Sequence, residues 1–238
     1  MPKIKRGATD LDGILLVDKP AGVTSHDVVD MVRKMTGEGR VGHAGTLDPA
    51  ATGLLIILVG PSTRLSEQLL NHDKTYLARI AFGRSTDTDD SEGKTLTEAE
   101  PLAQTGDADF ARSVLAGFVG TIEQMPPQFS AIKQSGQRAY VAARKGQTVE
   151  LVARTVHIYG IELLAATPDS WDISASVSKG TYIRSLARDI GEAVGCPAHL
   201  AALRRTRIGD WSVSQATTVE ELASLAAAGG LRERMIHL

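Results

Sequence analysis

The sequence is poor in cysteine and in aromatic residues, and it lacks long apolar runs. Cys196 is the single cysteine, which excludes an intramolecular disulfide and is typical of a reducing compartment. The apolar run 54–59 is too short to cross a membrane. After the basic start, the run 14–17 is too short for the core of a signal peptide. We therefore expect a cytoplasmic protein with no membrane association.

The sequence also lacks an excess of positive charge, since 26 Lys and Arg residues face 28 Asp and Glu residues and the formal net charge is −2. The acidic residues are concentrated in residues 86–110, which hold eight acids and one lysine, so this segment carries −7 and the rest of the chain +5. Basic residues recur at 3–6, 138–145 and 204–207. Phosphate contacts depend on such local clusters rather than on the total charge, although a single cluster is more often a solvated face.

The pattern of apolar residues predicts an α+β fold with a mixed, mainly antiparallel sheet. Strands and helices follow each other without the regular alternation of a doubly wound fold. Strands are expected at 12–17, 54–59, 76–82, 154–164 and 171–177, and helices at 25–35, 61–70, 109–118, 181–194 and 218–228. Residues 84–108 are acidic and rich in Thr, Asp and Gly, and we expect them to form an exposed excursion.

Residues 42–49, which read GHAGTLDP, are the most informative stretch. They place Asp48 on a glycine-framed loop between the helix 25–35 and the buried strand 54–59. Glycine lets a backbone approach a ligand closely, so a carboxylate on such a loop is a candidate for chemistry. The alternative is an Asp-Pro turn in which Asp48 caps its own backbone. The loop alone does not separate the two interpretations.

The motif GHAGTLDP, followed by Ala51-Thr52-Gly53, resembles the catalytic motif of the bacterial tRNA pseudouridine synthase B family. The resemblance extends to four further blocks in family order: DKPAGVTS at 18–25, DKTY at 73–76, SKGTYIR at 178–184 and HLAALRR at 199–205. Five ordered blocks covering most of the chain are far more specific than any one of them.

The resemblance implies the pseudouridine synthase fold, with a catalytic cleft crossing the middle of the sheet. We expect residues 1–217 to form the catalytic domain, with 84–108 as its acidic excursion. Residues 218–238 would form a short helical tail. Larger family members carry a further small C-terminal RNA-binding domain. Little room remains for it after the last block, so we expect it either to be absent from this branch or to have been cut off.

The implied reaction isomerises uridine 55 in the tRNA T-loop to pseudouridine. It breaks the glycosidic bond, turns the uracil over and rejoins it through carbon. It involves no redox change or group donor, so we expect no cofactor and no metal. The reaction needs a nucleophile, a pocket for the free base and a group that removes one carbon-bound proton. The resemblance makes Asp48 the nucleophile.

Two further residues are expected to act in catalysis. The resemblance implies that Arg184 keeps Asp48 ionised, because a nearby guanidinium lowers the pKa of a carboxylate. An arginine in the first turn of a helix is otherwise unusual, since that position favours acids. Tyr76 corresponds to the family tyrosine that stacks on the target base and takes the proton. From its place in a strand alone, Tyr76 would be a core residue.

Four more residues are expected to bind the substrate. Tyr182 and Leu203 correspond to residues that line the uracil pocket, although their spacing alone indicates packing. His43 is interpreted as an RNA contact that braces the gap left by a flipped base. Lys19 either supports the cleft or meets a phosphate, with a plain surface lysine as the alternative.

The expected partner is the T-arm stem-loop of tRNA, with no protein partner and a monomeric enzyme. Two alternatives remain at this stage. One is an RNA-guided pseudouridine synthase, which shares the catalytic blocks and needs a guide. The other is a non-catalytic tRNA-binding or folding protein, against which the combination of Asp48, Tyr76 and Arg184 argues.

Overall fold

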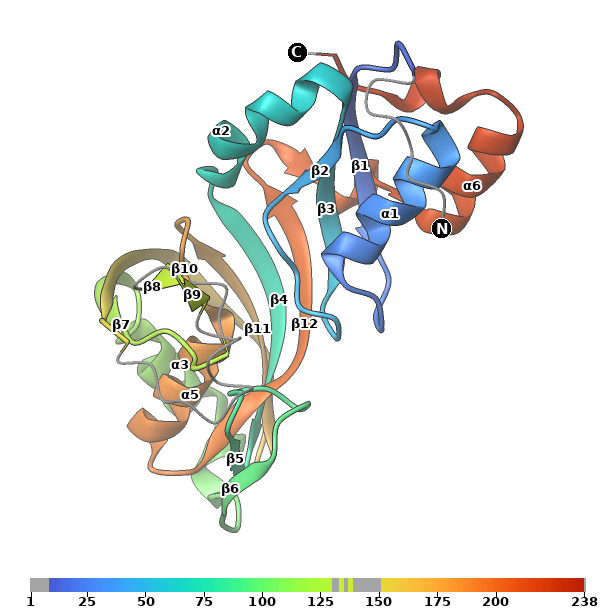
Figure 1. The fold of residues 1–238 in the computed structure, drawn as a ribbon. Coiled ribbons are helices and arrows are strands. Elements are labelled where there is room, and N and C mark those ends of the chain that lie inside the picture. Colours follow the sequence, from blue (N-terminus) through green and yellow to red (C-terminus); the bar gives the residue numbers. More distant parts are fainter. Residues whose placement is uncertain (1–8, 130–132, 135–136, 139–150, 238) are drawn as a thin grey trace. The chain divides into compact units, whose positions relative to one another are not determined.

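The computed structural model describes residues 9–129, 133–134, 137–138 and 151–237. The chain divides into two compact units. Unit 1 comprises the chain up to Thr75 and again from Arg204 onward, and unit 2 is Tyr76–Leu203. The boundary therefore falls inside two strands, β4 (Lys74–Phe82) and β12 (Ala198–Ile208) (Figure 1).

Unit 1 is built around the buried strand β3 (Thr52–Val59). This strand pairs antiparallel with β1 and β2 and parallel with the end of β12, and β14 lies parallel to β1. The other elements of the unit are β1 (Gly13–Lys19), α1 (Ser25–Thr36), β2 (Val41–Ala44), the 3-10 helix Gly60–Leu65, α2 (Ser66–Leu70), β13 (Trp211–Ser212), the 3-10 helix Val213–Gln215, β14 (Thr217–Thr218), α6 (Val219–Ala227) and the 3-10 helix Leu231–Arg234.

The alternation of side chains along β1 and β3 gives unit 1 an apolar core on each face of its sheet. Leu55, Ile57 and Val59 pack on one face with Val28, Val29 and Val32 of α1 and Leu222 of α6. Leu54, Ile56 and Leu58 pack on the other face with Leu69 of α2. All six residues from Leu54 to Val59 are completely buried. Burial of each such side chain stabilises the fold by roughly 1.5–3 kcal/mol, so β3 is a rigid base for the loop that precedes it.

The helix expected at 25–35 is confirmed as α1, and its ends have local causes. Thr24 and Asp27 form a capping box, in which each side chain accepts a hydrogen bond from the other residue's backbone N–H. Gly37 ends the helix with a left-handed φ of 69°. The helix expected at 61–70 is only partly α-helical, because a 3-10 helix containing Pro61 precedes α2.

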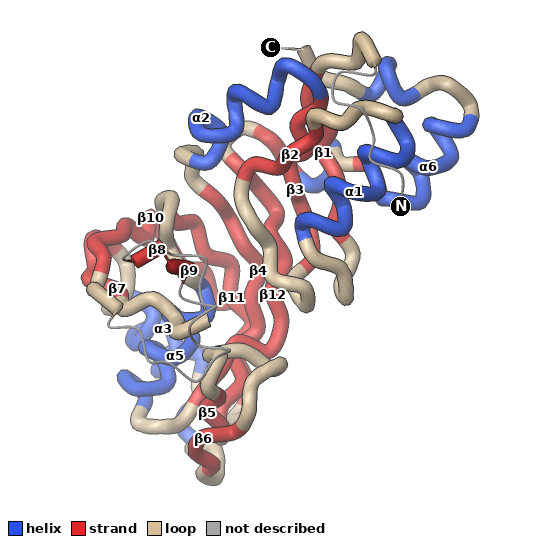
Figure 2. The backbone as a smooth tube through the Cα atoms, in the orientation of Figure 1, coloured by secondary structure: helices blue, strands red, loops and turns tan. Residues whose placement is uncertain are grey.

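Unit 2 contains a sheet in the strand order β12, β4, β11, β10, β7 (Figure 2). Strand β10 pairs antiparallel with both of its neighbours. The elements not yet introduced are β5 (Arg84–Thr86), β6 (Thr95–Glu98), the 3-10 helix Ala103–Gly106, α3 (Ala108–Ala116), β7 (Gly120–Gln124), β8 (Lys133–Gln134), β9 (Gln137–Arg138), β10 (Arg154–Thr167), β11 (Ser170–Val177) and α5 (Ile183–Val194).

Trp171, in unit 2, is the largest completely buried side chain among the described residues. Its indole ring is completely buried, and its Nε1–H donates to the Thr105 carbonyl at 2.7 Å. The ring of Phe82 packs edge-on against it, with 4.9 Å between the centroids. A buried indole needs such an acceptor, so this bond also fixes the segment around Thr105 against β11.

The acidic segment 84–108 differs from a uniformly exposed excursion. Strands β5 and β6 form a hairpin whose second strand is exposed, but the side chains of Asp89 and Asp90 are only 14% and 15% exposed. They turn inward because α5 presents Arg188 and Arg184 to them. The charge that looks solvated in the sequence is therefore partly neutralised inside unit 2.

The predicted α+β class and the mixed, mainly antiparallel sheet are confirmed. The strand β12 was not expected from its sequence, which contains four polar residues among its last five positions before Ile208. Within the described part of the chain, we find no helix that combines the length and the apolar character needed to cross a membrane.

Candidate active site

Asp48 is half-buried in the loop that connects β2 to β3. The glycine-rich motif begins inside β2, since Gly42, His43 and Ala44 pair with β3, and the loop itself starts at Gly45. Gly45 has a left-handed φ of 97°, which turns the chain out of the strand. The Asp48 carbonyl accepts from the Ala51 N–H at 3.1 Å, and this closes a turn directly before β3. The catalytic and the turn interpretations of Asp48 thus share one backbone geometry.

Buried side chains hold the loop on both sides of Asp48. Ser25 Oγ donates to the Leu47 carbonyl at 3.0 Å and accepts from the Leu47 N–H at 2.8 Å. Ser25 is the first residue of α1 and is 2% exposed. The residue before Asp48 is therefore fixed to the N-terminus of α1 through both of its backbone groups.

Lys19 holds the residue after Asp48. Its side chain is completely buried, and its Nζ donates to the carbonyls of Pro20, Val23 and Pro49 at 2.9, 2.7 and 3.1 Å. A buried ammonium requires such acceptors. Of the two roles expected for Lys19, this geometry favours support of the site, because a completely buried group is not placed to meet a phosphate.

The basic cluster 204–207 is not a single phosphate-binding face. Arg205 is 1% exposed and donates to backbone carbonyls around the Asp48 loop. Arg204 pairs with Asp18 at 2.7 Å and is 39% exposed. Arg207 is exposed. The sequence places these three arginines together, but neighbouring side chains along a strand point to opposite faces, so Arg204 and Arg205 diverge, and Arg207 is exposed near the end of β12.

His43 is a half-buried residue of β2, beside the start of the loop. Its pKa is lowered, first by burial, which disfavours the charged ring, and then by the positive charges of Arg205 and His26. Its Nδ1 is buried and has no hydrogen-bond partner among the described residues. A lowered pKa favours the neutral imidazole at pH 7, and a neutral ring fits a planar contact better than a charged phosphate ligand.

Arg184 lies in the first turn of α5 in unit 2 and is 7% exposed. Its guanidinium donates to the carbonyls of Thr88 and Phe129, both at 3.0 Å, and lies 3.6 Å from the Asp90 carboxylate. These acceptors offset the cost of a cation at a helix N-terminus. The pairing of Arg184 with Asp48 stays a prediction.

The other expected residues of unit 2 lie on three elements. Tyr76 is 8% exposed on β4, and Leu203 is half-buried on β12. Tyr182 is the N-cap residue of α5, and the buried amide of Gln124 bonds both its N–H, at 2.8 Å, and its carbonyl, at 3.1 Å. Unit 2 thus brings Tyr182 and Arg184 together at the start of one helix.

The sequence did not single out several residues that position these groups. Ser25 lay within a recognised block, but nothing in that block distinguished it as a loop anchor. Gln124, Asp89 and Asp90 had no local signal, because their partners on α5 lie far away in sequence. Such contacts become visible only in the folded chain.

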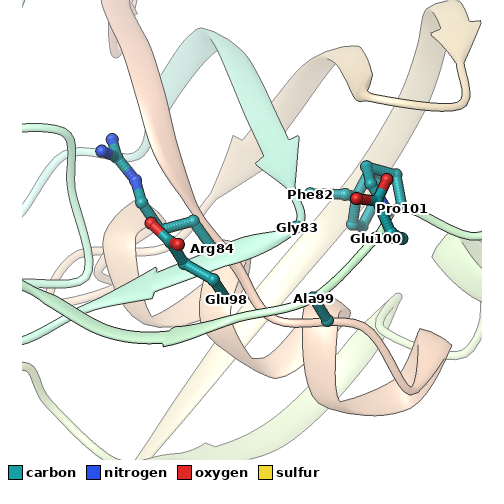
Figure 3. A pocket seen from close by; sticks show the side chains of 7 residues that line it. All are labelled: Phe82, Gly83, Arg84, Glu98, Ala99, Glu100 and Pro101. Carbon is teal, nitrogen blue, oxygen red and sulfur yellow. The ribbon is translucent and has the colours of Figure 1, made fainter.

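A shallow pocket of about 470 Å³ lies beside the β5–β6 hairpin in unit 2 (Figure 3). Its lining includes Phe82, Arg84, Glu98 and Pro101, and it contains none of the seven expected site residues. Among the described residues, no three His, Cys, Asp or Glu side chains are grouped so that they could hold a metal ion.

Two family models match the chain. The model for the N-terminal domain of the TruB family pseudouridylate synthases matches residues 33–183, and the model for the tRNA pseudouridylate synthase B C-terminal domain matches residues 184–236. The second match begins inside what we expected to be the catalytic domain and ends near Leu238. Our division at residue 217 stays a prediction.

Individual proteins agree with the family models. The tRNA pseudouridine synthase B of Thermobifida fusca (strain YX) is 51% identical over 221 residues, which are 90% of this chain and 75% of the relative. That of Bordetella avium (strain 197N) is 45% identical over 222 residues, 93% and 91% of the two chains.

Solved structures show the same fold. A chain of a Cbf5-Nop10-Gar1 complex superposes with a TM-score of 0.72 at 30% identity, and a chain of an H/ACA RNP bound to a substrate RNA containing 2'-deoxyuridine with 0.69 at 27%. Each superposition covers 94% of this chain but only 59% and 58% of those longer chains.

Proposed function

Because the chain belongs to the TruB family of pseudouridylate synthases, we propose that it isomerises uridine 55 in the T-loop of tRNA to pseudouridine, with Asp48 as the nucleophile. The observation that best supports this proposal is that buried side chains fix the loop that contains Asp48. The buried side chains of Ser25 and Lys19 hold the residues on either side of a half-buried carboxylate. Such an arrangement presents one reactive group in a fixed position.

Asp48 is suited to the first step of the reaction. A carboxylate is charged at neutral pH, and the covalent bond that it forms can be broken again. It attacks either C6 of the uracil or the ribose, and in both paths the glycosidic bond breaks and the base rejoins through C5. The proton on C5 is then removed, and in our proposal Tyr76 stacks on the base and takes this proton.

The remaining residues act on the charge and the position of the substrate. In our proposal Arg184 lies beside Asp48 and keeps it ionised, while Tyr182 and Leu203 line the uracil pocket. The neutral imidazole of His43 fills the gap that the flipped base leaves in the folded loop. Lys19 holds the catalytic loop in place rather than contacting RNA.

The proposed partner is the T-arm of tRNA, bound by a monomeric, cytoplasmic enzyme. The excess of positive charge outside residues 86–110 supports binding to phosphates. A second candidate is an RNA-guided synthase, since a chain of an H/ACA RNP bound to a substrate RNA is 27% identical to this chain. The relatives at 45–51% identity are tRNA pseudouridine synthases B, and they favour the first candidate.

The test is the activity of the purified protein on unmodified tRNA transcripts without guide RNA. We expect pseudouridine at position 55 and at no other uridine, and no product from a transcript with cytidine at that position. Asp48→Asn keeps the shape of the side chain, so it should bind tRNA within a few-fold of the wild type and yield no product. Activity that appears only with an added guide RNA would support the second candidate. Tight tRNA binding without product by the wild type would support the non-catalytic alternative.

A further inference from the structure

Arg205 is buried in unit 1 with its guanidinium among backbone carbonyls. It is 1% exposed. Its Nε donates to the Leu54 carbonyl at 2.7 Å, and its two terminal nitrogens donate to the carbonyls of Gly45 and Thr46 at 3.1 and 3.4 Å. One side chain thus joins the first buried residue of the β3 core to the start of the Asp48 loop.

The type of acceptor indicates what this arginine does. Within the described residues, the three groups that accept from Arg205 are all main-chain carbonyls. A buried guanidinium costs free energy unless its donors are satisfied, and here they are satisfied by main-chain oxygens. Because the guanidinium is planar and its N–H groups point in fixed directions, the positions of these carbonyls are fixed relative to one another.

The backbone of Arg205 is equally constrained. Strand β12 pairs in parallel with β3 so that Arg205 lies opposite Gly53. Gly53 has a left-handed φ of 101°, and a Cβ atom there would lie 2.3 Å from the Arg205 carbonyl oxygen. Only glycine allows the two strands to approach so closely. The side chain of Arg205 therefore starts from a fixed point and reaches a defined place in the loop.

Three buried side chains bond different parts of the Asp48 loop. Lys19 holds the Pro49 carbonyl, and Ser25 holds both backbone groups of Leu47. Arg205 holds the Gly45 and Thr46 carbonyls, the part of the loop that neither of the other two anchors reaches. Among the described residues, Arg205 is the side chain that bonds the Gly45 carbonyl, so its loss would leave the left-handed turn at Gly45 without this restraint.

We propose that Arg205 is a positioning residue for Asp48, and that it sets the direction of the nucleophile without contacting the RNA. The proposal rests on the function proposed above. It also changes the interpretation of the cluster 204–207, because the most buried of its arginines serves the catalytic loop instead of a phosphate.

Replacement of Arg205 by lysine gives the sharpest test. Arg205→Lys keeps the charge, but a single ammonium cannot reproduce a fork that spans Leu54 and Gly45. We expect the single-turnover rate, measured with enzyme in excess over tRNA and referred to folded protein, to fall about 10–100-fold, the size of effect that a misplaced reacting group produces. The dissociation constant for tRNA should stay within about two-fold, and its dependence on salt should be unchanged. Arg205→Gln should lose at least as much rate.

Arg33→Lys is the matched control. Arg33 is another arginine of unit 1 that donates to a backbone carbonyl; its side chain is 29% exposed, and its acceptor is Val41, at the opposite end of β2 from the loop. We expect this variant to lose stability but to keep the wild-type single-turnover rate. An equal loss of rate in both variants would show a general structural role and overturn the proposal.

Two other outcomes would also count against the proposal. A weaker tRNA affinity with a flatter salt dependence in Arg205→Lys would show a phosphate contact. A wild-type rate in Arg205→Lys and Arg205→Gln would show that the loop needs no such anchor. Absence of product with the wild-type protein would instead refute the proposed function, and it is detected in the same assay before any variant is compared.

Discussion

Arg188 and Asp89 form a partly buried ion pair in unit 2, in which the Arg188 guanidinium lies 2.9 Å from the Asp89 carboxylate. The pair holds a strained point of the chain, because Asp89 is the one described non-glycine residue with a positive φ, of 60°. The next residue, Asp90, faces Arg184, one turn earlier on α5. Two arginines one turn apart on α5 thus pair with two consecutive aspartates.

This relationship predicts a graded loss of stability at position 89. Asp89→Ala should lower the free energy of unfolding by about 2–3 kcal/mol, because it removes the pair and places a Cβ residue with no compensating bond at a left-handed φ. Asp89→Asn should lose less, since asparagine tolerates this conformation. Urea unfolding followed by circular dichroism measures the difference.

A glycine variant separates the two contributions. Asp89→Gly removes the ion pair but relieves the backbone, so it should be more stable than Asp89→Ala by about 1 kcal/mol. If the two variants are equally stable, the backbone conformation at position 89 contributes nothing, and the ion pair with Arg188 accounts for the whole effect.

His199 predicts a pH dependence of stability. Its Nδ1 lies 2.9 Å from the Arg84 carbonyl and its Nε2 lies 3.2 Å from the Arg84 guanidinium. A carbonyl only accepts and a guanidinium only donates, so Nδ1 carries the proton and Nε2 accepts. The pKa of His199 is lowered, chiefly by burial and further by the Arg84 charge, although the bond to the Arg84 carbonyl and the Asp90 charge oppose this.

The sign of the effect follows from proton linkage. Between the lowered pKa of the folded state and the ordinary value of 6.5, the unfolded chain binds a proton that the folded protein does not. Stability should therefore fall as the pH falls below about 6.5. His43, whose pKa is also lowered, contributes in the same direction. His199→Gln should show a smaller drop in melting temperature between pH 7.5 and 5.5 than the wild type, and an unchanged drop would contradict this assignment.

Tyr76 predicts a separation of stacking from proton transfer. Tyr76→Phe keeps the ring on β4 but removes the hydroxyl, whereas Tyr76→Ala removes both. If the hydroxyl takes the proton, Tyr76→Phe should abolish product formation while tRNA affinity is kept. If Tyr76→Phe is fully active and Tyr76→Ala is severely impaired, stacking is its whole contribution, about 1–3 kcal/mol. Mild and equal effects in both variants would place Tyr76 outside the pocket. Rates should be referred to folded protein, because Tyr76 is largely buried.

The elements with strong local patterns could be predicted from the sequence. The apolar run 54–59 predicted a buried strand, and the capping box at Thr24 with Gly37 predicted both ends of α1. Strand β12 could not be predicted, because three arginines interrupt its pattern near the end. The physical reason lies in the fold, since buried backbone carbonyls satisfy Arg205.

The candidate site likewise contains residues that the sequence could identify and residues that it could not. The resemblance identified Asp48 and its loop, because the motif is continuous in sequence. The groups that hold the loop and the α5 arginines come from distant segments, and no local pattern indicates that Arg205 turns inward while its neighbour Arg204 pairs with Asp18. Alternation along a strand decides this, and it requires knowledge of the register.

The composition of the chain predicts how it recognises RNA. Only 4% of the residues are aromatic, so an extended stacking platform for single-stranded RNA is not available. Specificity should then come from the shape of a folded loop with one flipped base, and affinity from phosphate contacts of the basic remainder of the chain. We therefore expect an isolated T-arm stem-loop to be modified nearly as well as whole tRNA, with an apparent affinity that decreases as the salt concentration rises.

An unstructured RNA with the same loop sequence is the matched control for this last prediction. It offers the same target uridine without the folded loop, so the protein would have to order the loop itself, and the conformational entropy lost in that step opposes binding. We expect the unstructured RNA to be a poor substrate at every salt concentration. Comparison of kcat/KM for the stem-loop, the unstructured RNA and whole tRNA measures the two contributions separately. Efficient turnover of the unstructured RNA would show that sequence rather than shape is recognised. A strict requirement for whole tRNA would show that phosphate contacts beyond the T-arm are essential, because the stem-loop retains both the target base and the folded loop.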